Sequence, residues 1–442
     1  MRNRRSWRVW MGALAVVALT LSACGGDDGG GTGGPAAGAV KTDVGITDEP
    51  CPGSSHQDRG CIYLGVLSDL TEGPFRALAV PITEGNKAFW KRVNDGGGIG
   101  GKYDVDIDTY TRDNKYNPQE HVAKFREIEP NVLALAQTLG TPTTLAALDL
   151  YKDVDIIGAP ASWWSGWAFE DVILESGYNY CVESMNGLDW VTEEFGKPAT
   201  VMAVHYPGDY GGDSAAGVSK WAQTNGVTFT PGSHDVQTLP NAQAGNQDAA
   251  VQAILRAKPS VVVVATGPAE MAEIVGKSAA QGFTGQFVGS VPTWNPALLQ
   301  SEAAPAIKAL FHFVSPWGPW ASDTPAHQAM EEAAGTQLPA NDGYTFGWIW
   351  SYPLKAVLDR AFQNGDLTRA GLKTAVGQVT VDYEGALPAK KLAGQPNETV
   401  VRESLIAKPD DAAPLGASVL KDFFVGATAQ NFQFTEPCAA AG

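Results

Sequence analysis

The chain has 442 residues, of which 48 are acidic and 31 are basic, so its formal net charge at pH 7 is −17. Such an acidic chain lacks the basic footprint that nucleic-acid phosphates require, and we expect no nucleic-acid partner. Its length exceeds one typical domain and favours a body of two lobes.

The first 23 residues are organised like a secretory signal. Four arginines precede an apolar stretch, Val9 to Leu21, that is too short for a comfortable transmembrane helix. The run Leu21-Ser22-Ala23-Cys24 resembles the cleavage site of a bacterial lipoprotein, in which the cysteine is acylated and becomes the first mature residue. We predict a lipoprotein signal peptide over residues 1–23 and a lipid on Cys24. An ordinary signal peptide with an incidental cysteine is the alternative.

The segment after Cys24 cannot bury a core, because Gly25 to Ala39 contains only glycine, aspartate, alanine, threonine and proline. We expect residues 24–50 to be a flexible tether that holds a folded body at the outer face of the cell membrane. No later segment has the length and apolarity of a spanning helix. Without the four arginines of the signal peptide, the mature chain carries a net charge of −21.

Four cysteines remain if Cys24 carries a lipid, namely Cys51, Cys61, Cys181 and Cys438. An even number in an oxidising compartment favours two disulfides, for which three pairings are possible. We prefer Cys51–Cys61, which would staple the mature N-terminus to the first strand, and Cys181–Cys438, which would tie the C-terminal tail to the body. A metal site is the alternative, but no CxxC or CxxH spacing supports it, and we expect no metal.

The body begins as an alternation of short apolar runs and segments with helical periodicity. The pattern predicts strands at residues 62–67, 103–110, 132–136 and 155–157. It predicts helices at residues 82–93, 118–128 and 143–152. Strand–helix alternation is typical of βαβ units and of a mainly parallel sheet that is buried on both faces.

A second series of the same kind begins after Cys181. The predicted strands are residues 199–204, 227–229, 260–265, 287–289 and 311–314. The predicted helices are residues 213–224, 247–257, 268–281, 325–334, 344–363 and 368–376. We therefore predict an α/β fold of two doubly wound parallel-sheet lobes. The expected boundaries are 51–181 and 317–380 for lobe 1, and 182–316 and 381–442 for lobe 2.

Two motifs suggest nucleotide binding or catalysis, and both fail on their context. Gly96, Gly98 and Gly101 match GxGxxG, but the predicted order is helix, glycines, strand, the reverse of a dinucleotide-binding turn. Ser214 follows Gly212, but Ala216 replaces the last glycine of GxSxG, so we assign Ser214 to the N-terminal turn of a helix. We expect no catalytic residue and no cofactor, and the chain is predicted not to be an enzyme.

Several segments resemble, in their order and spacing, the type I periplasmic binding proteins of branched-chain amino-acid transport. Ile62 to Pro74 (IYLGVLSDLTEGP) is similar to the opening strand and loop of that family. Asn94 to Gly101 (NDGGGIGG) resembles its turn between the first helix and the second strand. Arg112-Asp113, Tyr206 to Gly211 and Gly282 to Gly289 match later segments, so the similarity runs from about Ile62 to Tyr383.

The resemblance implies two lobes joined by three hinge crossings that close on a small-molecule ligand. It also implies delivery of that ligand to the permease subunits of an ABC importer, outside the cytoplasm. A cleft outside the carboxyl ends of the strands agrees with this, because loops and helix N-termini there present free N–H groups to an anion. We expect the protein to be a monomer.

The resemblance further implies individual ligand contacts. Thr141, beside the Gly140 backbone, falls where the family binds a ligand carboxylate, and Ser162 offers a second hydroxyl from the next contact loop. Tyr210 matches a tyrosine that closes over the ligand from the other lobe. Thr266-Gly267 ends the strongest strand of that lobe, where the family again contacts ligand. For each residue an ordinary loop or capping role is the alternative.

Two features depart from that family. Its amino-acid binders place a carboxylate near the position of Val291 to pair with the ligand ammonium, but Ser290 to Trp294 contains no acid. Trp163 and Trp294 lie in predicted loops, where tryptophan suits ligand stacking, and Arg76 could pair with a ligand carboxylate. We therefore predict an apolar or aromatic carboxylate or amide. An amino-acid-like ligand would need a substitute acid, for which the candidates are Asp69, Glu72 and Asp209.

Two other functions remain open. The same fold serves in ligand-sensing proteins that report to a partner receptor, although a fused kinase or DNA-binding helix would favour that function and this chain has neither. An exported hydrolase is the third candidate, and the missing nucleophile–base pair disfavours it.

Overall fold

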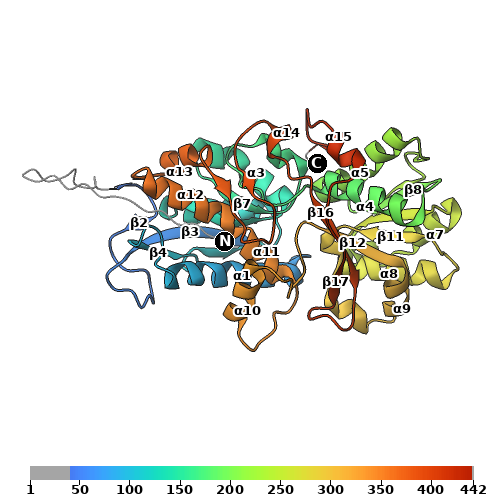
Figure 1. The fold of residues 1–442 in the computed structure, drawn as a ribbon, viewed down its shortest axis with the longest axis horizontal. Coiled ribbons are helices and arrows are strands. Elements are labelled where there is room, and N and C mark those ends of the chain that lie inside the picture. The colour runs from blue at the N-terminus through green and yellow to red at the C-terminus, as the bar shows by residue number, and fades with distance from the viewer. Residues whose placement is uncertain (1–39, 441–442) are drawn as a thin grey trace, which may run out of the picture. The chain divides into compact units, whose positions relative to one another are not determined.

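The computed structural model describes residues 40–440, drawn as a ribbon in Figure 1. Residues 1–39, which include the predicted signal peptide, Cys24 and most of the predicted tether, lie outside the described residues. The strand β1 (Lys41–Thr42) pairs with β13 (Asp366–Leu367), and β2 (Ile46–Thr47) pairs with β3 (Gly60–Ser68). The end of the predicted tether, from residue 40 to residue 50, is therefore part of the folded body.

The first sheet is built around the buried strand β3. Its strand order is β2-β3-β6-β7, with β4 and β5 also paired to β3, and every pair except β2–β3 is parallel. The strands have these bounds: β4 (Tyr103–Asp106), β5 (Thr111–Asp113), β6 (Ala134–Leu139) and β7 (Gly158–Ala161). The helices of this lobe are α1 (Arg76–Asp95), α2 (Pro118–Ile128), α3 (Thr141–Asp153), α10 (Pro325–Ala334), α11 (Gly343–Ile349), α12 (Ser351–Gln363) and α13 (Arg369–Val376). Helices cover both faces of the sheet, which explains why its strands are rich in buried apolar residues (Figure 1).

The second sheet has the strand order β17-β16-β12-β11-β10-β8-β9. Its bounds are β8 (Val201–His205), β9 (Asp235–Gln237), β10 (Val261–Ala265), β11 (Gln286–Gly289), β12 (Phe311–Ser315), β16 (Ser404–Pro409) and β17 (Ala417–Phe424). The first five of these strands are parallel, and β16 and β17 extend the sheet as antiparallel strands. The main helices are α4 (Tyr180–Phe195), α5 (Asp209–Asn225), α7 (Asp248–Ala257), α8 (Pro268–Ala280) and α9 (Ala304–Leu310). Short helices complete the lobe: α6 (Asn241–Ala244), α14 (Pro396–Thr399) and α15 (Ala427–Asn431).

Three segments carry the chain between the two sheets. They run from β7 to α4, from β12 to α10, and from the hairpin β14 (Thr380–Val381)–β15 (Lys390–Lys391) to β16. The hairpin contacts α12, so the third segment leaves the first lobe only after β15. Lys390 Nζ donates a hydrogen bond to the carbonyl oxygen of Glu175 (2.8 Å), which ties the first and third segments together.

Two glycines let α1 and α11 pack closely. A Cβ atom at Gly85 would lie 1.9 Å from the carbonyl oxygen of Tyr344, and one at Gly347 would lie 1.7 Å from that of Ile82. Neither position accepts a side chain without moving a helix. The close contact with α11 fixes the position of α1, and with it the positions of Leu78 and Ile82.

Most of the predicted elements are present. Helices α2 and α10 have the predicted bounds, and the glycines at 96–101 form a turn between α1 and β4. The prediction of a strand at 227–229 is wrong, because only an isolated bridge at Thr228 forms there and the sheet continues through β9. The strand expected at 155–157 forms as β7 instead, three residues later. Ser214 lies inside α5 rather than in its first turn, because the helix begins at Asp209.

Both preferred disulfides are present in the structure. Cys51 and Cys61 are joined with a Cα–Cα distance of 4.7 Å, and Cys181 and Cys438 with one of 6.3 Å. The second bond connects the first turn of α4 to the C-terminal tail. Within residues 40–440, no helix combines the length and apolarity needed to cross a bilayer.

Candidate functional site

A cavity of about 40 Å³ lies between the lobes, at the carboxyl ends of β6 and β7. Its first-lobe lining residues are Phe75, Leu78, Ala79, Ile82, Tyr116, Leu139, Gly140, Thr141, Ala161, Ser162, Trp163 and Trp350. Its other lining residues are Tyr180, Tyr210 and Pro292. Five of the predicted ligand contacts (Gly140, Thr141, Ser162, Trp163 and Tyr210) thus come together around one space.

The N-terminus of α3 faces this cavity. Gly140 precedes the helix with a φ of +92°, and a Cβ atom there would lie 2.4 Å from the Tyr116 ring, so only glycine fits. The amide groups of Thr141 and Thr143 belong to the first turn and have no acceptor within the helix. The buried hydroxyl of Thr141 makes no hydrogen bond with any described residue. This end of the cavity therefore presents free donors to an anion.

Ser162 presents a second hydroxyl to the same space. Its Oγ accepts a hydrogen bond from Trp167 Nε1 (3.0 Å), which orients the side chain. None of the described residues accepts a hydrogen bond from this hydroxyl, so it can donate one to a ligand.

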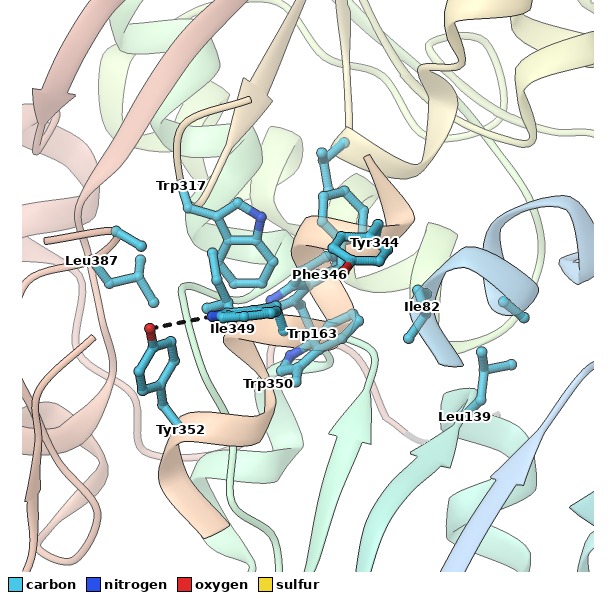
Figure 2. Close-up of a cluster of buried hydrophobic side chains, with 14 of the residues drawn as sticks. Ile82, Leu139, Trp163, Trp317, Tyr344, Phe346, Ile349, Trp350, Tyr352 and Leu387 are labelled. Carbon is cyan, nitrogen blue, oxygen red and sulfur yellow. Dashed lines mark hydrogen bonds between the residues drawn. The ribbon is translucent and has the colours of Figure 1, made fainter. Parts of the chain in front are cut away.

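One wall of the cavity is aromatic. The Trp163 ring lies 4.7 Å from the Trp350 ring and 5.9 Å from the Tyr180 ring, measured between centroids. Trp163 Nε1 donates to the carbonyl oxygen of Ser176 (2.9 Å), which fixes its plane. In Figure 2 these tryptophans lie on one side, with Ile82 across from them. The wall can contact a large apolar or aromatic group.

Tyr210 closes the cavity from the second lobe. Its ring lies 4.7 Å from that of Tyr180, and its hydroxyl donates to the carbonyl oxygen of Thr266 (3.2 Å). Thr266-Gly267, which we predicted to contact ligand, is therefore connected to Tyr210 but does not line the cavity.

Two buried carboxyl groups lie near the cleft. Asp209 begins α5, and burial raises its pKa, while the nearby Thr141 hydroxyl opposes this shift. Glu183 accepts hydrogen bonds from the Val291 amide and the Tyr178 hydroxyl, both at 2.8 Å, and burial raises its pKa to about 8. The sequence around Val291 contains no acid, but the fold brings Glu183 to it from α4.

Four residues that the sequence suggested as ligand contacts or as partners of a ligand ammonium lie outside this cavity. Arg76 donates to the Thr71 carbonyl oxygen near the surface and does not line the cavity. The Asp69 carboxylate accepts from the Gly73 and Phe75 amides before α1, and Glu72 pairs with Lys115 on the surface. Trp294 lines a second, smaller cavity.

Two solved structures resemble this chain over most of its length. A fatty acid ABC transporter substrate-binding protein from Thermomonospora curvata has 26% identity and a TM-score of 0.79 over 89% of this chain and 97% of its own. A branched chain amino acid ABC transporter from Thermus thermophilus with bound valine has 18% identity and a TM-score of 0.72, over 84% of this chain and 98% of its own. No curated protein matches the sequence.

A model of a protein family also matches most of this chain. The family model described as periplasmic binding protein matches residues 62–413, which include the cleft and most strands of both sheets. The expected two-lobed fold with parallel sheets is present. The chain belongs to the periplasmic binding protein family.

Proposed function

We propose that this protein is a lipid-anchored, extracytoplasmic solute-binding protein that delivers an apolar or aromatic carboxylate or amide to an ABC importer. Members of its family bind solutes rather than catalyse reactions. The observation that carries the proposal is the cleft itself, in which free donors at the start of α3 lie across from an aromatic wall.

The two ends of the cleft suit the two parts of such a ligand. A carboxylate or amide oxygen accepts hydrogen bonds from Thr141, from the first amides of α3 and from the Ser162 hydroxyl. The apolar part packs against Trp163 and Trp350, while Tyr210 covers it from the second lobe.

Ligand entry requires motion. A space of about 40 Å³ holds only one or a few water molecules, so a larger ligand enters only after the lobes separate or the aromatic side chains move. Three connecting segments allow such a hinge motion, and a ligand that contacts both lobes favours the closed form.

The charges disfavour an amino-acid ligand. No acidic residue lines the cavity formed by the described residues, and Glu183 is protonated at neutral pH because burial raises its pKa to about 8. Asp209, beside Thr141, is also buried, which raises its pKa and disfavours its ionised form. An α-ammonium group would therefore lose its hydration in this cleft with no carboxyl group among the lining residues to compensate. The relative from Thermomonospora curvata is named for a fatty acid, a carboxylate with no ammonium group, which supports the same choice.

Anchoring rests on the sequence of the N-terminal segment. The Leu21-Ser22-Ala23-Cys24 run and the following glycine-rich stretch support a lipid at Cys24. A tether of this kind would keep the body beside the permease subunits with which we propose it interacts.

Thermal-shift measurements test the proposal. We expect a clear rise in melting temperature with some apolar or aromatic carboxylate or amide, and little or none with leucine, isoleucine or valine. Ligand at 100 times its dissociation constant stabilises the protein by about 2.7 kcal/mol. Thr141→Ala should weaken binding by about 1–3 kcal/mol, because it removes a buried donor. Thr374→Ala, on the exposed face of α13, is the matched control. Submicromolar leucine binding would contradict the proposal.

A further inference from the structure

A second cavity of about 10 Å³ lies between the lobes beside the first one. Leu78 of α1 lines both cavities. In the wall of the second cavity, Trp294 and Phe313 come from the second lobe. Trp317 and Phe346 belong to the rest of that wall. Its wall, like that of the first cavity, therefore depends on how the lobes meet.

Aromatic side chains that contact one another line the facing sides of the two cavities. Trp163 and Trp350 line the first cavity, and Trp317 and Phe346 line the second. The Trp163 ring lies 5.5 Å from that of Trp317 and 5.7 Å from that of Phe346, so these rings are in contact (Figure 2). Trp317 follows β12 on a segment that connects the lobes, so the proposed hinge motion would move its ring relative to that of Trp163.

Two of the aromatic residues that line the second cavity carry unpaired donors. Trp294 Nε1 and Trp317 Nε1 are buried and have no hydrogen-bond partner among residues 40–440. A buried donor without an acceptor is costly, so a ligand that supplies an acceptor here gains affinity.

A buried acid limits what that acceptor can be. Asp342 also lines the second cavity and accepts a hydrogen bond from the Trp320 amide (2.9 Å). Burial raises its pKa only to about 6, so it is largely ionised at pH 7.5. A second ligand carboxylate would be repelled there, whereas a neutral oxygen would not.

We propose that the two cavities are the two ends of one elongated site, and that the ligand is a monocarboxylate with an extended apolar body and a neutral oxygen, such as a hydroxyl or keto group, at its far end. The carboxylate lies at Thr141, the body passes Leu78, and the far oxygen meets the indole groups of Trp294 and Trp317. This inference rests on the proposed function and specifies its ligand.

The first experiment measures how affinity depends on ligand length. The protein is the body Val40–Gly442, a compact unit that contains both sheets and both disulfides. The probes are straight-chain carboxylates of six to twelve carbons and their terminal hydroxy derivatives, titrated by calorimetry at pH 7.5. We expect affinity to rise about fourfold for each methylene that becomes buried, up to one optimal length. At that length the terminal hydroxyl should add roughly two- to tenfold.

Two variants locate the effect. Ala407→Leu fills the second cavity and should remove the gain from chain length while leaving hexanoate binding unchanged. Trp294→Phe removes one donor and should abolish the advantage of the hydroxy acids alone. Ala272→Leu adds the same volume at a buried site that lines neither cavity, and it controls for general overpacking.

The outcomes are distinguishable. If no straight-chain carboxylate binds the wild-type body, the elongated site is refuted, and the thermal-shift screen with aromatic carboxylates and amides decides the proposed function. If carboxylates bind but affinity is the same from six to twelve carbons, or if hydroxy acids bind no better at any length, the elongated site is refuted while the proposed function stands.

Discussion

At the scale of single residues, burial sets the chemistry of the cleft. Glu183 is 1% exposed, and its two acceptor bonds from Val291 and Tyr178 do not compensate for the loss of water, so its pKa rises. The protonated side chain fixes the turn at Val291–Thr293, next to Pro292 in the cavity wall, without placing a charge there.

Glu183→Gln should remove a pH dependence of stability. The folded-state pKa of Glu183 is about 8, above its ordinary value of 4.5, so its contribution is fully present below pH 4.5 and is lost as the pH rises through 8. Between pH 4.5 and 8, the free energy of unfolding of the wild type should fall, relative to that of the variant, by up to about 1.4 kcal/mol per pH unit. Urea unfolding at pH 5, 7 and 8.5 measures the difference. Parallel stability curves for the two proteins would contradict the assignment.

The sequence predicted only part of the site, for a physical reason. Thr141, Ser162 and Tyr210 occupy loops or helix starts at strand ends, where a parallel sheet places its ligand contacts. Tyr180 and Trp350 reach the cavity from α4 and from the junction of α11 and α12, and no local pattern indicates which face of a buried helix borders a cleft.

At the scale of elements, capping signals explain the best predictions. Helix α2 begins after Asn117, whose side chain accepts from the Glu120 amide, and α10 begins after Thr324, which caps in the same way. Both have proline in the first turn. Helix α4 was not predicted, because nine consecutive residues from Tyr180 to Leu188 are buried and leave no amphipathic period.

The tail that follows α15 is held by more than its disulfide. The Cys438 amide donates to Ser165 Oγ (2.7 Å), and the Asp213 carboxylate accepts from the Ser165 amide (3.0 Å). Ser165 lies three residues after Ser162 of the cavity wall. The Cys181–Cys438 bond therefore holds the tail against a loop that helps to form the site.

Cys181→Ser combined with Cys438→Ser should lower the free energy of unfolding by about 2–5 kcal/mol, because the disulfide closes a long loop. The smaller loop of Cys51–Cys61 makes that pair of serine substitutions the comparison, with a smaller expected loss. Chemical denaturation measures both. An unchanged midpoint for the 181/438 variant would contradict a structural role for this bond.

At the scale of the whole molecule, the alternation of strands and helices predicted two parallel-sheet lobes, and the sheets confirm this architecture. Their antiparallel extension by β16 and β17 was not predicted, because the pairing of β16 with β12 joins segments about 90 residues apart and no local pattern sets it. Pairing between segments this far apart depends on tertiary contacts.

Cys24→Ser should leave the fold intact and release the protein from membranes, because it removes the predicted site of lipid attachment. Membrane fractionation of cells that express each protein measures the effect. Cys51→Ser, which changes a cysteine of the body, is the control that should remain in the membrane fraction. Equal retention of Cys24→Ser and the wild type would contradict the lipoprotein assignment.

The central claim is that the cleft between the lobes binds an apolar carboxylate rather than an amino acid. Calorimetric titration of the body with decanoate, and separately with leucine, tests it most directly. We predict saturation at one decanoate per chain, with a negative heat-capacity change from buried apolar surface, and no measurable heat with leucine. Saturable, submicromolar binding of leucine with no response to decanoate would contradict the account.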